Sequence, residues 1–165
     1  MKTAIIYYSR TGNTRHVVQL LENKMKEKKL DVDIIEIQAV KRPGFLGAGR
    51  AAMKELELPI VNEGVDLKQY DLLIIGSPVW GGMPSPFIKT FLSKAKNVKG
   101  KQAAWFIAGG GAVGSHEKTK SAMKRQLEET GLNVIDSFLE LKMGKGKILE
   151  GEQQIDGFIA SVTGS

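Results

Sequence analysis

Residues 5 to 14 read Ile5-Ile6-Tyr7-Tyr8-Ser9-Arg10-Thr11-Gly12-Asn13-Thr14, an apolar run that passes into a hydroxyl-rich loop with one glycine. After this loop Val18, Leu21 and Met25 recur at helical intervals, so the loop joins a predicted strand to a predicted helix. Backbone N–H groups at a helix start lack intrahelical acceptors, and such a loop can wrap a phosphate with N–H and O–H donors alone. The alternative is an ordinary turn in which Thr or Asn caps the helix.

Predicted strands and helices alternate along the rest of the chain. Besides Thr3–Tyr8, strands are expected at Val32–Ile37, Leu72–Ile75, Ala103–Ala108 and Asn133–Leu139. Helices are expected at Asn13–Lys29, Phe45–Leu56, Pro84–Lys96, His116–Thr130 and Gln153–Val162, and the stretch 38–69 is otherwise irregular. Parallel neighbours require crossovers, so we predict one α/β domain over residues 1–165, a doubly wound five-stranded parallel sheet with helices on both faces. Ligands bind such sheets beyond the carboxyl ends of the strands.

A second candidate loop follows the strand that ends at Ile75, and it reads Gly76-Ser77-Pro78-Val79-Trp80-Gly81-Gly82. A large aromatic side chain at the mouth of the sheet is poorly placed for core packing, but a flat ligand ring can stack against Trp80. The two glycines permit a close approach of the backbone and positive φ angles. The alternative is that Trp80 covers a hydrophobic rim.

The third candidate loop follows Ala108 and reads Gly109-Gly110-Gly111-Ala112-Val113-Gly114-Ser115-His116. It also fits the G-x-G-x-x-G dinucleotide pattern, with Glu140 as a possible ribose-binding acid. A dinucleotide fold, however, needs more sheet after this point than the single strand that remains. His116 is expected to begin a helix rather than to act in catalysis, and His16 is expected on a helix surface.

Composition excludes several classes of function. The chain has no cysteine, which excludes disulfides, thiolate metal sites and thiol catalysis and is typical of a cytoplasmic protein. No spacing of the two histidines indicates a metal site, and no apolar run is long enough to span a membrane. The net charge of +6 raises the question of nucleic acid, but the lysines concentrate at helix ends, where they complement the helix dipole. The charge is therefore taken as evidence about docking partners.

Taken together, the three loops resemble those of flavodoxins. Residues 5–14 are similar to the flavodoxin phosphate-binding signature, residues 76–82 are similar to the second flavin loop, and the glycine-rich stretch after Ala108 matches the third loop in position. The resemblance covers nearly the whole chain in element order, and the first motif is its specific part. It implies the strand order 2-1-3-4-5 and one non-covalently bound FMN.

The same resemblance implies a role for each loop. Ser9 to Thr14 would hold the FMN phosphate, Trp80 would flank the isoalloxazine ring, and Gly109 to Gly114 would offer backbone groups to its pyrimidine edge. A carbonyl in the turn at Gly81 and Gly82 would rotate to accept a hydrogen bond from N5 of the reduced flavin, which favours one-electron transfer.

The chain departs from the flavodoxin pattern in three ways. The third loop has no aromatic residue to cover the outer flavin face, which is therefore expected to be more open, partly covered by Val113, His116 or Met83. Val113 and His116 are accordingly included among the residues expected to bind the cofactor. The chain is basic where many flavodoxins are acidic, so we expect an acidic redox partner, a ferredoxin-like protein or an oxidoreductase, and neither nucleic acid nor a membrane span. The segment from Lys142 to Lys147 is interpreted as flexible and has no assigned role.

Three classes of function remain open. The leading hypothesis is an FMN electron carrier that shuttles electrons between redox partner proteins. The second is an FMN-dependent NAD(P)H:quinone-type oxidoreductase, in which the region from Arg42 to Glu63 would supply a lid or a dimer contact. The third is an interaction module that has lost its cofactor, which the three intact loops argue against.

Overall fold

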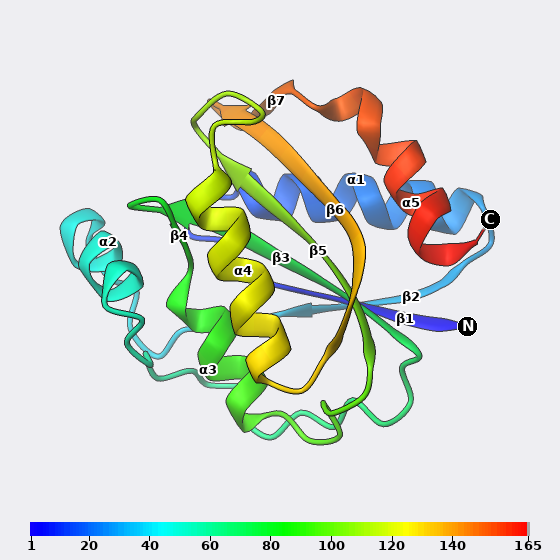
Figure 1. The fold of residues 1–165 in the computed structure, drawn as a ribbon, viewed down its shortest axis with the longest axis horizontal. Helices are drawn as coiled ribbons and strands as arrows, with labels where there is room; N and C mark the ends of the chain where they lie inside the picture. Colours follow the sequence, from blue (N-terminus) through cyan, green and yellow to red (C-terminus); the bar gives the residue numbers. More distant parts are fainter. Residues whose placement is uncertain (165) are drawn as a thin grey trace.

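The structure, a computed structural model, describes residues 1–164 and is built on a mainly parallel sheet (Figure 1). Its long parallel strands are β1 (Lys2–Tyr7), β2 (Asp31–Glu36), β3 (Leu72–Trp80), β5 (Gln102–Gly109) and β6 (Asn133–Gly144). They lie in the order β2-β1-β3-β5-β6. This is the order 2-1-3-4-5 when the parallel strands alone are counted, so the predicted fold class is confirmed.

Two short antiparallel strands extend this sheet beyond the prediction. β4 (Met83–Pro84) turns back on the end of β3, and β7 (Lys147–Glu150) pairs with the end of β6. The segment from Lys142 to Lys147, interpreted from the sequence as flexible, is thus the end of β6 and the turn into β7. The turn residues Lys145 and Gly146 both have positive φ, as the tightest hairpins require.

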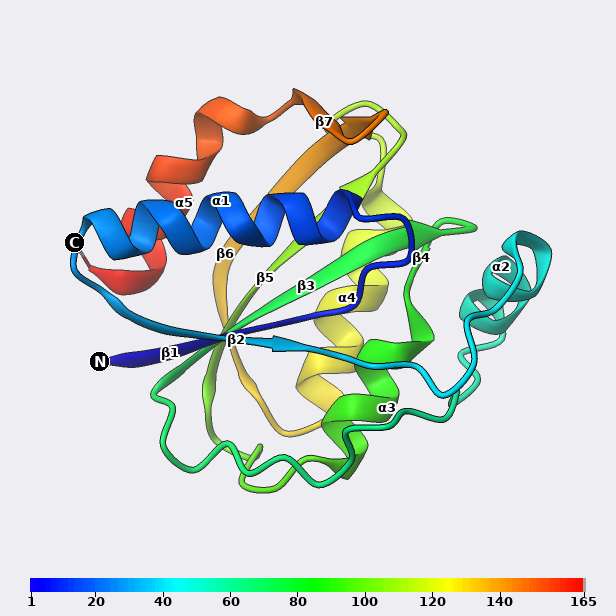
Figure 2. The ribbon, with the colours of Figure 1, turned by 180° about the vertical axis from the view of Figure 1, so that it is seen from behind.

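The helices form a layer on each face of the sheet. α1 (Asn13–Glu27) and α5 (Ile155–Thr163) cover one face, and α3 (Pro86–Lys94) and α4 (Glu117–Glu129) cover the other (Figures 1 and 2). α2 (Phe45–Met53) stands apart from both layers, beside the turn between β3 and β4. All five begin within two residues of their predicted starts. No helix in residues 1–164 has the length and apolar character needed to cross a lipid bilayer.

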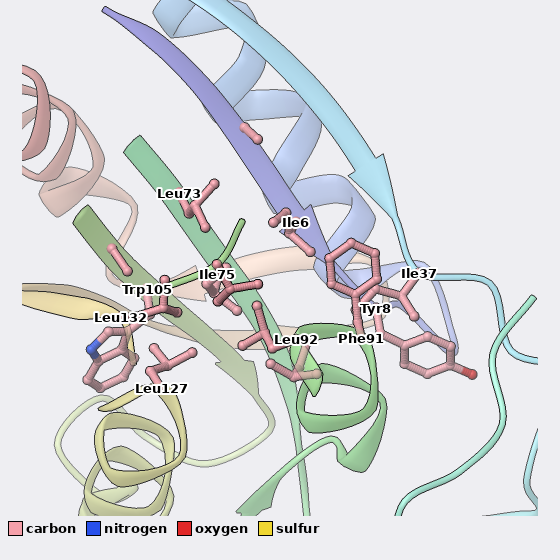
Figure 3. Packing of buried hydrophobic residues seen from close by; sticks show 14 of the residues in the cluster. Ile6, Tyr8, Ile37, Leu73, Ile75, Phe91, Leu92, Trp105, Leu127 and Leu132 are labelled. Carbon is pink, nitrogen blue, oxygen red and sulfur yellow. The ribbon is translucent and has the colours of Figure 1, made fainter. Parts of the chain in front are cut away.

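Burial on both faces explains why the central strands read as continuous apolar runs. Alternate residues of each strand enter opposite clusters, so Ile6 packs on the α3 and α4 side while Ile5 packs on the α1 and α5 side. Figure 3 shows the first cluster, where Ile75 of β3 lies among Phe91 and Leu92 of α3. The strands are therefore rigid supports for the loops at their ends.

Gly76 is the position in β3 that allows this packing to continue to the carboxyl edge. It pairs directly with Phe106 of β5, and the aromatic ring lies over the glycine. A Cβ atom added at Gly76 would come within 2.2 Å of the Phe106 ring. The absence of a side chain at this position is therefore a packing requirement, since no positive φ is recorded there.

We predict that Gly76→Ala lowers the free energy of unfolding by about 1–3 kcal/mol, because the added methyl group overpacks the Phe106 ring. Urea denaturation checks this value. Gly157→Ala, in an exposed part of α5 with open space around the position, is the matched control and should gain about 0.5–1 kcal/mol. If Phe106→Leu recovers none of the loss in the Gly76→Ala background, the proposed clash is not its cause.

Candidate functional site

A cavity of about 620 Å³ opens at the carboxyl ends of β1, β3 and β5, the edge where ligands bind in sheets of this class. Its volume is that of a typical small-molecule or cofactor pocket. The walls come from the three glycine-containing loops, from α2 and from Met143 of β6. Because parallel strands point their carboxyl ends the same way, loops far apart in the sequence meet here.

The predicted site residues divide into two groups. Ten line the cavity: Arg10, Thr11, Asn13, Thr14, Pro78, Val79, Trp80, Gly81, Gly109 and Gly110. Seven lie outside its lining: Ser9, Gly12, Gly82, Gly111, Val113, Gly114 and His116. That any of these residues contacts a cofactor stays a prediction, but the structure shows what each group does within the chain.

In the first loop, Ser9 shapes the backbone rather than facing the cavity. Its Oγ accepts hydrogen bonds from the N–H groups of Gly12, at 3.1 Å, and Arg15, at 3.3 Å. Gly12 has a φ of 95°, in the left-handed region where glycine is favoured. Asn13 and Thr14 then begin α1, where backbone N–H groups have no intrahelical acceptor. The loop thus presents free donors to the cavity.

Arg10 adds a cation to this donor set. Its Nε is buried and has no hydrogen-bond partner among the described residues, while its guanidinium lies 5.8 Å from the centre of the Phe45 ring on α2. A buried donor without a partner is costly, because it has lost its water without gaining an acceptor. An anionic group such as a phosphate, bound at this loop, would supply that acceptor.

The second loop is a tight hairpin beside a cluster of aromatic rings. Trp80 is half-buried and contacts Tyr8 and Phe87 edge-on, with ring centroids 5.5 and 6.2 Å apart. It also lines the cavity, so packing against the core and contact with a ligand are compatible. Gly81 and Gly82 have φ angles of 56° and 76°. Positive φ at both central residues is the signature of a type I′ turn.

Within residues 1–164, a side-chain hydrogen bond holds one of the two glycine carbonyls in this turn and none holds the other. The Gly82 carbonyl accepts a hydrogen bond of 2.8 Å from the Thr119 hydroxyl on α4. A rotation of the peptide between Gly81 and Gly82 moves the Gly81 carbonyl instead and converts the type I′ turn into type II′, the other common two-residue hairpin. The carbonyl expected to turn towards a flavin is therefore that of Gly81.

The third loop is held by two glutamates that sequence reasoning did not place there. Glu140 Oε1 accepts hydrogen bonds from the Gly114 N–H, at 2.9 Å, and from His116 Nδ1, at 2.7 Å. Glu150 on β7 accepts one of 3.1 Å from the Val113 N–H. These two amides are therefore unavailable to a ligand, and Gly109 and Gly110 remain at the cavity. The buried, bonded Glu140 is also not free to bind a ribose.

Glu140 is ionised despite being only 3% exposed. Burial alone raises the pKa of a carboxyl, but the hydrogen bonds from His116 and Gly114 and the nearby Lys120 ammonium outweigh it. The net result is a pKa for Glu140 below its usual value of 4.5. The distance from Lys120 Nζ to Glu140 Oε2 is 3.4 Å.

α2 supplies part of the cavity wall. Sequence reasoning assigned the region from Arg42 to Glu63 only a lid or a dimer contact in the oxidoreductase hypothesis, and named none of its residues as lining a site. Arg50, Lys54 and Met53 line the wall, together with Phe45 and Leu46 at its amino end. The Phe45 and Leu46 side chains are 78% and 85% exposed. The spacing from Leu46 to Arg50, and from Arg50 to Met53 and Lys54, places these residues on one helical face, and this was the signal available in the sequence.

Comparison with known proteins identifies the family. Residues 1–141 match the family described as NADPH-dependent FMN reductase. The chain belongs to the NADPH-dependent FMN reductase family. The FMN cofactor predicted from the sequence is thereby confirmed, and the site fits it through the unpaired Arg10 Nε, the free N–H groups at the start of α1 and the size of the cavity.

Similarity to three other proteins is consistent with membership in this family. A flavoprotein in complex with FMN from Lactobacillus acidophilus NCFM is 26% identical, with 96% of this chain and 98% of that one covered and a TM-score of 0.70. Oxidised flavodoxin 2 from Bacillus cereus is 22% identical, with coverage of 94% and 91% and a TM-score of 0.60, and it shows the shared fold. The protein named "Probable flavodoxin 1" of Bacillus subtilis (strain 168) is 22% identical over 145 residues, 86% of this chain and 78% of that one. The predicted flavodoxin-like character is thus confirmed.

We predict that Arg10→Gln weakens FMN binding roughly 10- to 100-fold, because a charged hydrogen bond to the phosphate is lost. Fluorescence titration of the apoprotein measures this affinity. The affinity for riboflavin, which has no phosphate, should change little in this variant. Arg15→Gln is the matched control, since its guanidinium pairs with Glu36 instead of lining the cavity. An equal loss of FMN and riboflavin affinity in Arg10→Gln would contradict a phosphate contact.

A second prediction concerns Glu140 and pH. Because the pKa of Glu140 is lowered in the folded protein, its ionised form stabilises the fold above its usual value of 4.5, and this stability is lost as the pH falls below that value. Wild type should therefore be more stable than Glu140→Gln at neutral pH, with the difference shrinking in acid. Urea denaturation across this range tests it, and the exposed Glu27→Gln is the control. A difference that does not vary with pH would count against an ionised Glu140.

Proposed function

We propose that this protein is an FMN-dependent NADPH oxidoreductase, which accepts a hydride from the nicotinamide on its flavin and passes the electrons to a small acceptor such as a quinone or a free flavin. The observation that carries this proposal is the composition of the cavity wall. Three cations line it, Arg10, Arg50 and Lys54, and no carboxylate among the described residues does. This is more positive charge than one cofactor phosphate requires.

The cations of the cavity come from two segments of the chain and suit two different anionic groups. The first loop and Arg10 are suited to the FMN phosphate, as argued above. Arg50 lies on α2 and Lys54 directly follows this helix, which stands beside the turn between β3 and β4. We infer that the cations contributed by α2 and its end bind the phosphates of a second ligand while the first loop stays occupied by the cofactor. The additional 2′-phosphate distinguishes NADPH from NADH, so these cations favour the phosphorylated nucleotide.

The approach of a nicotinamide ring also requires an accessible flavin face. No residue from Gly109 to Glu117 is aromatic, so the third loop provides no ring to stack over the flavin. The apolar side chains of Phe45, Leu46 and Met53 are exposed at the same cavity. They offer a surface on which a second planar ring can pack. FMN itself supplies the redox chemistry when bound, and the protein positions the reacting rings.

An electron carrier is the second candidate, and the hairpin at Gly81 and Gly82 is the observation that favours it. Exchange between two turn types with a carbonyl at the cavity would couple the backbone to the redox state of a flavin. Such coupling serves single-electron transfer between proteins. A reductase requires no such exchange of turn type, because its flavin is reduced directly by a nicotinamide nucleotide. A carrier is instead reduced by a partner protein, so the two candidates differ in the electron donor that reduces the bound FMN.

We predict that the FMN-loaded protein oxidises NADPH without a partner protein, and that Arg50→Gln with Lys54→Gln raises the KM for NADPH roughly tenfold or more with little change for NADH. The steady-state decrease in absorbance of the reduced nicotinamide measures the rate of oxidation of NADPH and of NADH. The control replaces Lys28 and Lys29, two exposed lysines after the end of α1, with Gln.

Two results would decide against this proposal. The first is FMN-loaded protein that NADPH reduces no faster than free FMN but that a reductase protein reduces readily, which would identify a carrier. The second is an equal effect of the α2 substitutions on NADPH and NADH, which would remove Arg50 and Lys54 from recognition of the 2′-phosphate.

A further inference from the structure

His116 is a buried imidazole with one nitrogen left unused. It stands at the amino end of α4 and is 8% exposed. Its Nδ1 lies 2.7 Å from Glu140 Oε1, whereas Nε2 makes no hydrogen bond to any described residue. The only other histidine, His16, is exposed on α1. Nε2 is not among the fully buried side-chain atoms that lack a partner, so it keeps contact with solvent and can exchange a proton with it.

The surroundings of Nδ1 determine which form the imidazole takes. Glu140 is ionised and can only accept hydrogen bonds, so Nδ1 carries the proton and donates it. In the neutral imidazole, Nε2 then holds a lone pair that can bind a further proton. The charged groups that face His116 are Glu140 from β6 and, on α4, Lys120, which also pairs with Glu117. Protonation of Nε2 would create an imidazolium held beside a carboxylate.

The unused nitrogen lies directly behind the wall of the cofactor cavity. A Cβ added at Gly109 would come within 2.9 Å of His116 Nε2, and one added at Gly111 within 2.8 Å. Gly109 lines the cavity, as does Val79, whose side chain lies beside the same glycine. Gly109 thus belongs to the cavity lining and also has the imidazole as a close neighbour. Charges that interact through protein rather than through bulk water interact more strongly.

We propose that His116 is a redox-linked proton acceptor: when FMN in the cavity is reduced, Nε2 takes up one proton from solvent and holds it as an imidazolium paired with Glu140. An N–H bond forms at Nε2 and no other bond in the protein changes. The electrons come from the reductant, NADPH or a chemical reductant such as dithionite. The added negative charge of the reduced flavin is what raises the affinity of Nε2 for the proton. His116 thus acts through charge, as a positioning residue that touches no substrate.

This inference rests on FMN binding and not on the proposed NADPH oxidation, so the two can fail separately. Dithionite reduces the cofactor without any nicotinamide nucleotide. The variant His16→Gln changes only an exposed side chain and leaves His116 as the single imidazole in the chain. Its NMR signal can be followed against pH with the cofactor oxidised and again with the cofactor fully reduced.

In His16→Gln we expect the His116 signal to titrate at higher pH after reduction, with roughly a tenfold gain in proton affinity. Identical titrations in the two states, or no titration in either, would overturn the proposal. Glu140→Gln in the same background should lower the proton affinity in both states, because the paired negative charge is removed. Unchanged affinity in that variant would also overturn it.

A second measurement follows the midpoint potential of the two-electron couple against pH. A tenfold difference in proton affinity between the two states corresponds to about 30 mV in such a couple. Wild type and His16→Gln should both show this additional pH dependence, and His116→Gln, which keeps a donor for Glu140, should lose it. If His116→Gln retains the wild-type dependence, the proton is held elsewhere and the proposal is wrong.

Discussion

Two parallel strands cannot be joined by a tight turn, so each parallel neighbour in this sheet is reached through a crossover that packs on one face. With helices on both faces, the strands are buried on both sides and their carboxyl ends all point to one edge. The loops after β1, β3 and β5 meet there although about 100 residues separate the first from the last. The cavity is a consequence of this topology, and the loops differ only in the chemistry that they bring to it.

The hairpin of β6 and β7 fixes the third of these loops. Glu140 and Glu150 project from this hairpin and accept the N–H groups of Gly114 and Val113. A glycine-rich loop loses much conformational entropy on ordering, and hydrogen bonds to charged acceptors are among the stronger means of offsetting that cost. The antiparallel strand β7 therefore contributes to the site from outside it, by holding the loop that forms its wall.

The fold was accessible to sequence reasoning because local patterns determine it. Continuous apolar strands, helical spacing and glycine-rich loops each follow from short-range rules, and the strand order followed from the family resemblance. The positions of all three loops were predicted for the same reason. The roles of α2 and Glu140 depend instead on which segments meet in space. In the sequence, Arg50 and Lys54 are indistinguishable from ordinary solvated cations. Nothing in the sequence around Glu140 predicts its hydrogen bonds to residues 24 and 26 positions before it.

The charges of the site are divided between two layers. Arg10, Arg50 and Lys54 line the cavity, whereas Glu140 and Glu150 lie behind the third loop and are bound to its amides. A carboxylate inside the cavity would oppose both an anionic cofactor and an anionic nucleotide, but one behind the loop can orient a histidine without facing either. The same division suits a site in which negative charge grows during reduction, because the cations in front and a proton gained behind both act to stabilise it. If the proposed reduction and protonation take place, one arrangement of charge would serve both cofactor binding and the redox step, and the glutamates would act on the site through the third loop.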